Sequence, residues 1–292
     1  MKKIFICIIF LGKILTFSFY NEINNLPIAN SCMFSTEQSV IDNRSFNVIS
    51  NPAMIALNTQ VDYLLEYNKL LYYAQTSFDN IGFLIGKNRF GVVINRFSSG
   101  QINVRDIDGV DTNQTIEYSL TTLNLATAIE LASNKHSGLY GGITGTISWE
   151  KINIETKSYN VNIGAIYNYD TGNNVIRIGT VIKGMTSKDA AVYHCGILAK
   201  IGSLSFISGY ENKFVDRLNE KIKLGLAFNL SLPYLTIKNL SFGVGHLWGR
   251  QSYVRQTTFG LSINFDTIIL SYSFAIHQYL GTLQSFNIGI EL

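Results

Sequence analysis

The sequence predicts an all-β protein, a transmembrane antiparallel β-barrel of about fourteen strands, with twelve or sixteen also possible. Three observations support this fold class. Only 15% of the 292 residues are charged, against a usual share of about a quarter. Segment after segment from residue 60 alternates large apolar residues with small ones, and a period of two is typical of β-strands. The second face carries Gly, Ser, Thr, Asn and Ala, whereas a soluble sheet shows many charged residues to water.

Residues 1–20 have the pattern of a secretory signal peptide. Lys2 and Lys3 form a basic start, and a short apolar stretch follows them, as such peptides require. Lys13 interrupts the apolar stretch, which argues against a retained membrane anchor, and we expect cleavage near Tyr20. Removing three lysines from the 23 basic residues leaves basic and acidic residues equal at 20. The mature chain is therefore near neutral, which excludes the electrostatic footprint of a nucleic-acid partner.

Residues 21–58 differ from the rest of the chain because they contain two of the three prolines and no sustained alternation. Asn51 is followed by Pro52, and Asn as N-cap with Pro as first helical residue is a typical helix start. We therefore expect a short helical turn from Ala53 to Leu57, ahead of the strands.

The strands of the predicted barrel occupy residues 59–292. In the segment "KIKLGLAFNLSL" (221–232), Ile, Leu and Phe alternate with Lys, Gly, Ala, Asn and Ser. Such strands suit a barrel whose apolar face meets lipid and whose small polar face fills the interior. Turn signals separate the runs at 133–138, 170–174, 186–190 and 232–234. Short spacing predicts antiparallel hairpins. A long hairpin is expected over 98–120, and segments 137–150 and 217–230 are long enough to protrude from the bilayer.

The chain ends on the apolar stripe of a strand, "SFNIGIEL". In hydrocarbon every backbone N–H and C=O group needs a partner, so the last strand must pair with the first. We expect this stripe to close the barrel against lipid, and barrel-assembly machinery accepts such endings, although a leucine replaces the more usual terminal aromatic. The residues of the stripe are Phe286, Ile288, Ile290 and Leu292.

Residues 48–57, "VISNPAMIAL", contain Asn51, Pro52 and Ala53 followed by an apolar residue. With the strands behind it, this motif resembles the PorV/PorQ-like family of outer-membrane barrels, part of the wider FadL-type class. The similarity continues as a pattern with few identities through 90–109, 138–152, 161–184 and 280–292. The family usually has a glycine-rich stretch before Asn-Pro-Ala, whereas residues 33–50 contain no glycine. The chain therefore resembles a divergent member.

The resemblance implies that residues 21–58 form a plug or hatch inside the barrel, and that the protein resides in the outer membrane of a Gram-negative-type bacterium. The residues alone leave a second possibility open, in which Asn51 only caps a turn at the barrel rim. Arg177, Lys183 and Lys223 fall on the small, polar faces of their segments. We expect them to line the lumen, where they would favour anionic or polar contents.

Catalytic, cofactor and metal motifs are weak. The acidic segment "DIDGVD" (106–111) has its glycine at position four, whereas an EF-hand loop needs it at position six, so a hairpin turn is the better interpretation. His194 and Cys195 are adjacent and point to opposite faces of a strand. The other histidines, His136, His246 and His277, show no metal spacing. No "GxSxG" motif occurs, so neither an enzyme nor a bound cofactor is expected. One disulfide between Cys32 and Cys195 stays possible.

Aromatic residues at strand ends suggest an interfacial girdle, with ordinary β-propensity as the alternative. They are Tyr63, Tyr72, Tyr73, Trp149, Tyr167, Tyr169, Trp248 and Tyr272.

Three functions compete. By resemblance to PorV/PorQ-like proteins, the barrel would serve type IX-like protein export, with secretion components and secreted cargo as partners. By resemblance to FadL-type barrels, it would pass hydrophobic small molecules. An outer-membrane enzyme is the third and is disfavoured, since no site is evident.

Overall fold

The computed structural model describes residues 39–42, 44–71, 76–105, 111–151, 155–186, 191–214, 220–232, 237–250, 255–277 and 281–292, with only the backbone for 102–105, 111–113 and 277. The predicted signal peptide, Tyr72, Tyr73, Cys32 and the tip of the "DIDGVD" segment lie outside these residues. No helix in the described part of the chain is long and apolar enough to cross a bilayer.

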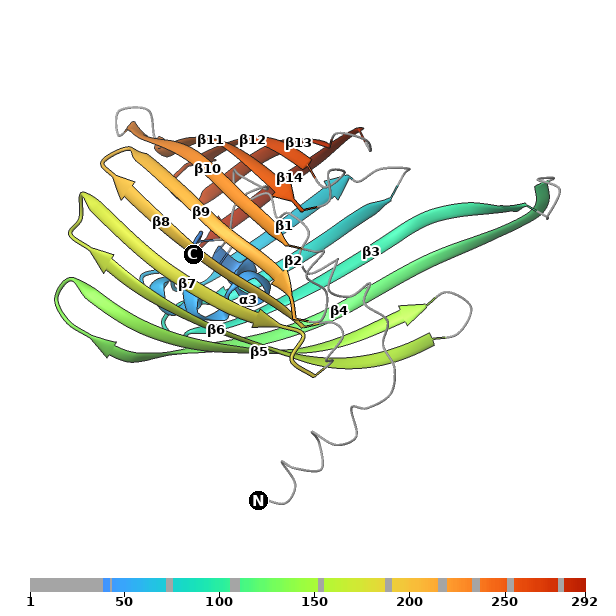
Figure 1. Cartoon of the computed structure of the whole chain (residues 1–292), viewed down its shortest axis with the longest axis horizontal. Coiled ribbons are helices and arrows are strands. Elements are labelled where there is room, and N and C mark those ends of the chain that lie inside the picture. Colours follow the sequence, from blue (N-terminus) through green and yellow to red (C-terminus); the bar gives the residue numbers. More distant parts are fainter. Residues whose placement is uncertain are drawn as a thin grey trace, which may run out of the picture.

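Fourteen antiparallel strands close into one barrel (Figure 1), which confirms the predicted fold class. Every strand pairs with its neighbours in the sequence, and β1 also pairs with β14. The strands are β1 (Leu64–Leu71), β2 (Ser77–Ile85), β3 (Phe90–Arg105), β4 (Asp111–Ser133), β5 (Ser137–Lys151), β6 (Glu155–Asp170), β7 (Asn174–Lys183), β8 (Val192–Ile201), β9 (Leu204–Lys213), β10 (Lys221–Leu232), β11 (Ile237–Gly249), β12 (Arg255–Asn264), β13 (Ile268–His277) and β14 (Gly281–Glu291).

The barrel closes through an unbroken ladder between β1 and β14. Their register runs from Leu64 opposite Glu291 to Leu71 opposite Gln284 without a shift. Beyond the strand, the Leu292 N–H donates to the Tyr63 carbonyl at 2.9 Å, and the Tyr63 N–H donates to the Leu292 carbonyl at 3.1 Å. The ladder leaves no sheet edge, and an edge could not survive in hydrocarbon because its unpaired groups would each cost several kcal/mol.

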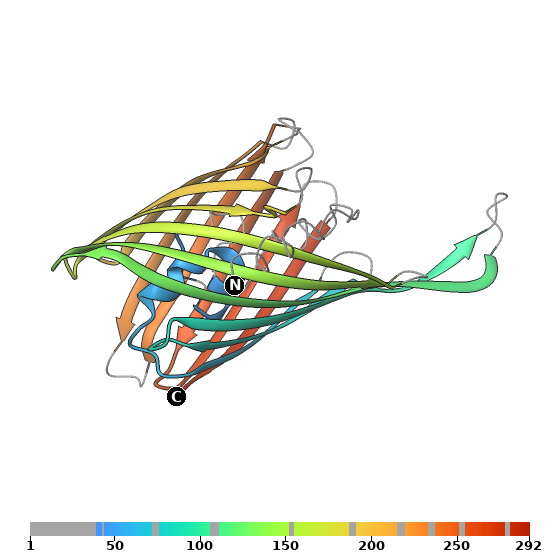
Figure 2. The same ribbon diagram turned by 90° about the horizontal axis from the view of Figure 1, so that it is seen from below.

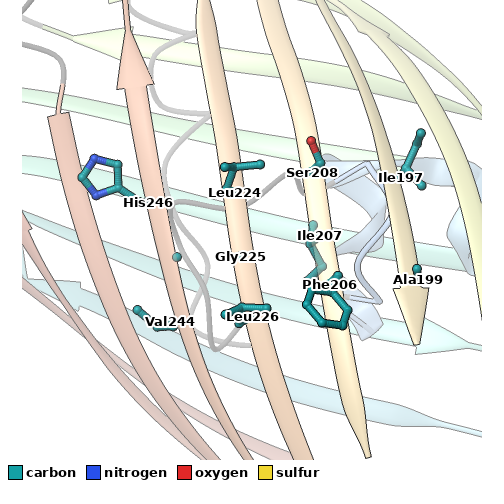
Figure 3. A pocket seen from close by; sticks show the side chains of 11 residues that line it. Ile197, Ala199, Phe206, Ile207, Ser208, Leu224, Gly225, Leu226, Val244 and His246 are labelled. Atoms are coloured by element: carbon teal, nitrogen blue, oxygen red, sulfur yellow. The ribbon is translucent and has the colours of Figure 1, made fainter. Parts of the chain in front are cut away.

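The outer face of the barrel is apolar. Phe286, Ile288 and Ile290 are 47%, 46% and 43% exposed, while Asn287 and Gly289 between them are buried. The same alternation holds on β10 and β11, where large apolar side chains lie over the strands (Figure 3). Trp248 lies one residue from the end of β11, as a girdle residue would, but Tyr272 lies in the middle of β13. Its predicted place near a strand end is wrong.

The two ends of the barrel differ. One end has short connections at 86–89, 134–136, 171–173, 202–203 and 265–267, and the C-terminus lies there too, beside Tyr63. The other end has longer ones, such as 184–191 and 214–220. There the β3–β4 hairpin projects far beyond the barrel (Figures 1 and 2), because β4 spans 23 residues against the 9–11 that cross a bilayer. This is the long hairpin expected over 98–120.

A charge in the centre of the β14 stripe should destabilise the barrel in a bilayer. We expect Ile288→Arg to lower the free energy of unfolding by about 2–4 kcal/mol, because arginine at the midplane of a barrel wall must enter lipid. Leu292→Arg, at the rim, should cost at most about 1 kcal/mol. Urea titrations in lipid vesicles measure both, and equal costs at the two positions would contradict a lipid-facing stripe.

Candidate functional site: the plugged lumen

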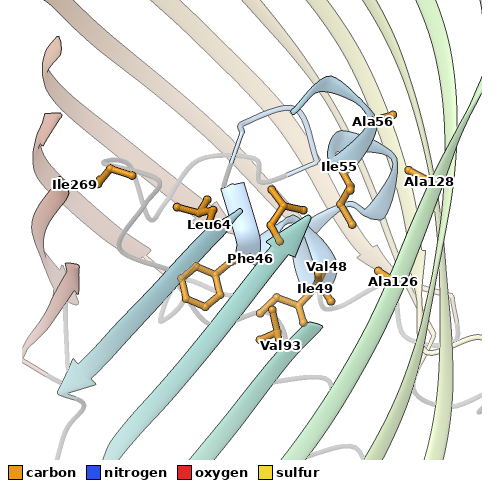
Figure 4. Packing of buried hydrophobic residues seen from close by; sticks show 11 residues of the cluster. Phe46, Val48, Ile49, Ile55, Ala56, Leu64, Val93, Ala126, Ala128 and Ile269 are labelled. Carbon is orange, nitrogen blue, oxygen red and sulfur yellow. The ribbon is translucent and has the colours of Figure 1, made fainter. Parts of the chain in front are cut away.

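The N-terminal segment lies inside the barrel. It consists of the 3₁₀ helix η1 (Arg44–Phe46), the short helix α3 (Asn47–Ser50) and the 3₁₀ helix η2 (Pro52–Leu57). Almost every residue from Ser39 to Ala56 that the structure describes is buried. The segment packs against β1 to β6, and Figure 4 shows its helices enclosed by strands. We call residues 39–58, as far as they are described, the plug.

Apolar side chains fix the plug to the wall. Phe46, Val48 and Ile55 have no exposed surface, and each buried side chain of this size contributes about 1.5–3 kcal/mol. They pack with residues from five strands into one cluster (Figure 4). The wall residues of this cluster are Leu64, Leu84, Val93, Ala126, Ala128 and Ile269.

Glycines in the wall make room for the plug. A Cβ atom added at Gly142 would overlap the backbone of Pro52 and Ala53, and one at Gly164 would overlap the Asn51 side chain. Gly142 and Gly164 are direct cross-strand partners, so together they form a flat seat for the Asn-Pro-Ala motif. Similar overlaps would arise elsewhere between the plug and the wall, at Gly82, Gly86, Gly91 and Gly179. Within the segment "GLYGGITG" (138–145), Gly142 is therefore the glycine that makes room for the plug.

Asn51 joins the plug to the wall. Its Oδ1 accepts a hydrogen bond from the Ala53 N–H at 3.1 Å and so caps η2. Its Nδ2 donates to the Ser39 carbonyl at 2.7 Å, and lies 3.4 Å and 3.5 Å from the carbonyls of Ala165 on β6 and Thr180 on β7. The cap thus lies inside the barrel, away from the rim, and it ties two parts of the plug to two strands.

Glu66 is a second polar attachment, on the opposite side of the lumen. Its carboxylate is buried on β1 and accepts hydrogen bonds from the Ser45 N–H at 2.9 Å and from the Ser45 hydroxyl. Asn287 of β14 donates to the same carboxylate at 3.4 Å. On β5, the Thr144 hydroxyl donates to the Val48 carbonyl at 2.5 Å. Buried polar groups are costly without partners, so these bonds favour one seated position of the plug.

A row of uncharged polar side chains runs around the lumen next to the plug. Its members are register partners on ten consecutive strands of the closed barrel. Neighbours bond to one another, for example Asn80 Nδ2 to Asn68 Oδ1 at 2.9 Å, and Ser241 Oγ to Asn229 Oδ1 at 2.6 Å. This polar row comprises Asn229, Ser241, Ser262, Ser271, Asn287, Asn68, Asn80, Asn95, Thr122 and Ser148.

Charged groups gather on the other side, on β7 to β10. Glu211 is 4% exposed and lies 2.7 Å from the Lys223 ammonium and 2.8 Å from that of Lys221, with the His194 ring at 3.7 Å. Lys183 is 2% exposed. Because β7 to β10 bring these groups to the inner face, this part of the lumen is electrostatically distinct from the polar row.

Arg177 is also on β7, where its Nε donates to Asn168 Oδ1 at 2.9 Å and its guanidinium interacts with the carboxylates of Asp42 in the plug and Asp170. The three basic residues proposed from the sequence thus point inward, but they do not converge. Lys223 shares Glu211 with Lys221, while Arg177 faces the plug.

Several site residues were not identified from the sequence, chiefly Ser45, Glu66 and Glu211. The signal that could have found the two acids is the alternation along the strand, because an acid on the face of small residues points into the barrel and must be paired there.

His194 lies in the lumen and Cys195 on the opposite face of β8, where its thiol is free. Within the described ranges, no three His, Cys, Asp or Glu side chains are grouped to hold a metal ion.

A closed barrel with a helical segment inside defines the class of plugged membrane β-barrels. The chain is similar in structure to the Pseudomonas putida toluene transporter TodX, with a TM-score of 0.55 and 9% identity over 88% of this chain and 96% of that one. A Pseudomonas aeruginosa FadL homologue gives a TM-score of 0.52 and 8% identity, over 90% and 97% of the two chains.

CdiB from Acinetobacter baumannii matches less well, with a TM-score of 0.45 and 12% identity over 79% of this chain and 60% of CdiB. This chain therefore spans less than two thirds of CdiB, and that likeness assigns no fold. No family model and no curated protein matches the sequence. The solved structures thus support the FadL-type barrel fold.

A methyl group on the glycine seat should loosen the plug. We expect Gly142→Ala to destabilise the seated plug by about 1–3 kcal/mol, the usual cost of overpacking. Trypsin cleavage after Arg44, the one basic residue of the plug sequence, should accelerate by the corresponding 5- to 150-fold, roughly. Gly145→Ala is the matched control, because Gly145 lies on the same strand with nothing within 4 Å of an added Cβ. Equal cleavage of both variants would contradict the seat.

Proposed function

We propose that this protein is an outer-membrane transport protein, in which the N-terminal plug controls passage of small hydrophobic molecules through the barrel. The observation that carries the proposal is a plug held inside a closed barrel by apolar packing, glycine seats and a few hydrogen bonds. A lumen filled by a separable segment of the same chain suits a controlled passage better than an open pore.

Two features favour small hydrophobic molecules. The polar row carries no charge, and its groups bond to one another, so an uncharged solute that displaces water there leaves no buried charge without a partner. The structurally similar TodX is described as a toluene transporter, and CymD as a monoaromatic hydrocarbon channel. At identities of 8–9%, these two proteins do not establish the cargo of this chain. Their cargo guides the choice of toluene as the experimental probe, and a hydrophobic cargo for this chain is part of our proposal.

Protein export is the second candidate, in the manner of PorV/PorQ-like proteins. It is favoured by the Asn51-Pro52-Ala53 motif and by the β3–β4 hairpin, which projects beyond the barrel wall (Figure 2) and offers a partner protein an extended surface. In this candidate the plug stays in place, and the outer surface and hairpin contact secretion components or cargo.

A reversible disulfide between the plug and the wall, which we call the latch, distinguishes the two candidate functions. The Cβ positions of Ser45 and Gly82 lie 2.9 Å apart, so Ser45→Cys with Gly82→Cys can form a disulfide after a shift of about 1 Å. Cys32 and Cys195 are first replaced by serine. We expect the oxidised latch to reduce uptake of labelled toluene by whole cells to the level of a deletion strain, and reduction to restore it. Ser45→Cys alone is the control.

Uptake that is equal in the oxidised and reduced states would contradict control by the plug. If, in addition, secretion components or cargo co-purify with the barrel in both states, protein export becomes the better function. Absence of uptake in the reduced latch and in the control together would exclude toluene-like cargo.

A further inference from the structure

The outer wall carries a depression on the face that meets the membrane. It lies over β8 to β11, has a volume of about 530 Å³, and is lined almost entirely by apolar atoms (Figure 3). Small outward residues create it, since Ala199 and Ser208 lie among larger neighbours. Those neighbours are Ile197, Phe206, Leu224, Leu226 and Val244.

Polar groups border the depression at the side nearer the long-loop end. The His246 ring lines its edge, and its Nδ1 lies 2.7 Å from the Thr257 hydroxyl. The Trp248 ring packs against the His246 ring at an interplanar angle of 55°, with centroids 4.1 Å apart. Trp248 is the cross-strand partner of Arg255, and His246 that of Thr257. Arg255 is therefore the diagonal neighbour of His246 on the same face, a distance that a long side chain spans.

Among the residues that the structure describes, Arg255 has no carboxylate within ion-pair distance. Glu220, which precedes β10 at the same end of the barrel, lies 3.8 Å from Arg250. A tryptophan and an arginine at the long-loop end of an apolar strand face mark the level of the lipid headgroups. The depression below them therefore lies at the depth of acyl chains, and the charge above it at the depth of phosphates.

We propose that the wall over β8 to β12 binds one membrane lipid, with an acyl chain in the depression and an anionic phosphate head against Arg255 and His246. Short connections are typical of the periplasmic end of bacterial barrels, so this lipid belongs to the outer leaflet. The site depends on the barrel lying in a bilayer, but not on what the barrel transports.

Tryptophan fluorescence tests the site, because Trp149 and Trp248 are the two tryptophans of the sequence. In Trp149→Phe protein, Trp248 reports on the site alone. In vesicles, we expect phosphatidylglycerol with brominated chains to occupy the site about fivefold more readily than brominated phosphatidylcholine, the factor that one basic residue contributes near anionic lipid. Trp248→Phe protein, in which Trp149 reports from β5, should show no preference.

Two variants separate head from chain. Arg255→Gln should abolish the preference for the anionic lipid, whereas Lys238→Gln, at the other rim of β11, should leave it intact. Ser208→Leu fills the depression and should weaken quenching of Trp248 by both lipids. The proposal would be overturned if the two lipids quenched Trp248 equally in Trp149→Phe protein, in which the site residues are unchanged. It would also be overturned if Arg255→Gln had no effect on the preference. If neither lipid quenched Trp248, the proposal would also be overturned, and the result would indicate that another protein covers this face.

Discussion

The structure depends on one constraint, that backbone N–H and C=O groups in hydrocarbon must be paired within the protein. The ladder between β1 and β14 satisfies it and continues to the last residue, where Leu292 and Tyr63 bond to each other in both directions. Closure then fixes what each face must be. The outer residues meet lipid and are apolar, while the inner residues face a lumen that other groups must fill.

The plug fills part of that lumen, and apolar packing together with a few hydrogen bonds attaches it to the wall. Phe46, Val48 and Ile55 alone contribute about 5–9 kcal/mol by burial, so the seated position of the plug is strongly favoured. A few polar groups, chiefly Asn51 and Glu66, fix the position of the plug. In the proposed transport function, a ligand would have to bind the unplugged state better than the plugged one, and it would shift the equilibrium only by that difference in affinity.

Alternation along single strands made the fold predictable from the sequence, because the face of each residue follows from parity alone. It placed Phe286 and Ile288 outward and Lys183 and Lys223 inward. The contacts of the plug were not predictable, since they join distant residues: Ser45 and Glu66 are 21 positions apart, and Asn51 and Thr180 are 129. The glycines near residue 142 indicated free space, but only the fold shows that the Asn-Pro-Ala motif occupies it. Tyr272 shows that aromatic type alone does not give depth in the membrane.

The orientation of the two faces is tested most directly by nitroxide labels placed one at a time from Leu224 to Asn229 of β10, in lipid vesicles. Accessibility to dissolved oxygen, which concentrates in hydrocarbon, should alternate with a period of two. It should be high at Leu224, Leu226 and Phe228 and low at Gly225, Ala227 and Asn229. A flat profile, or high oxygen accessibility at the second set, would contradict the account.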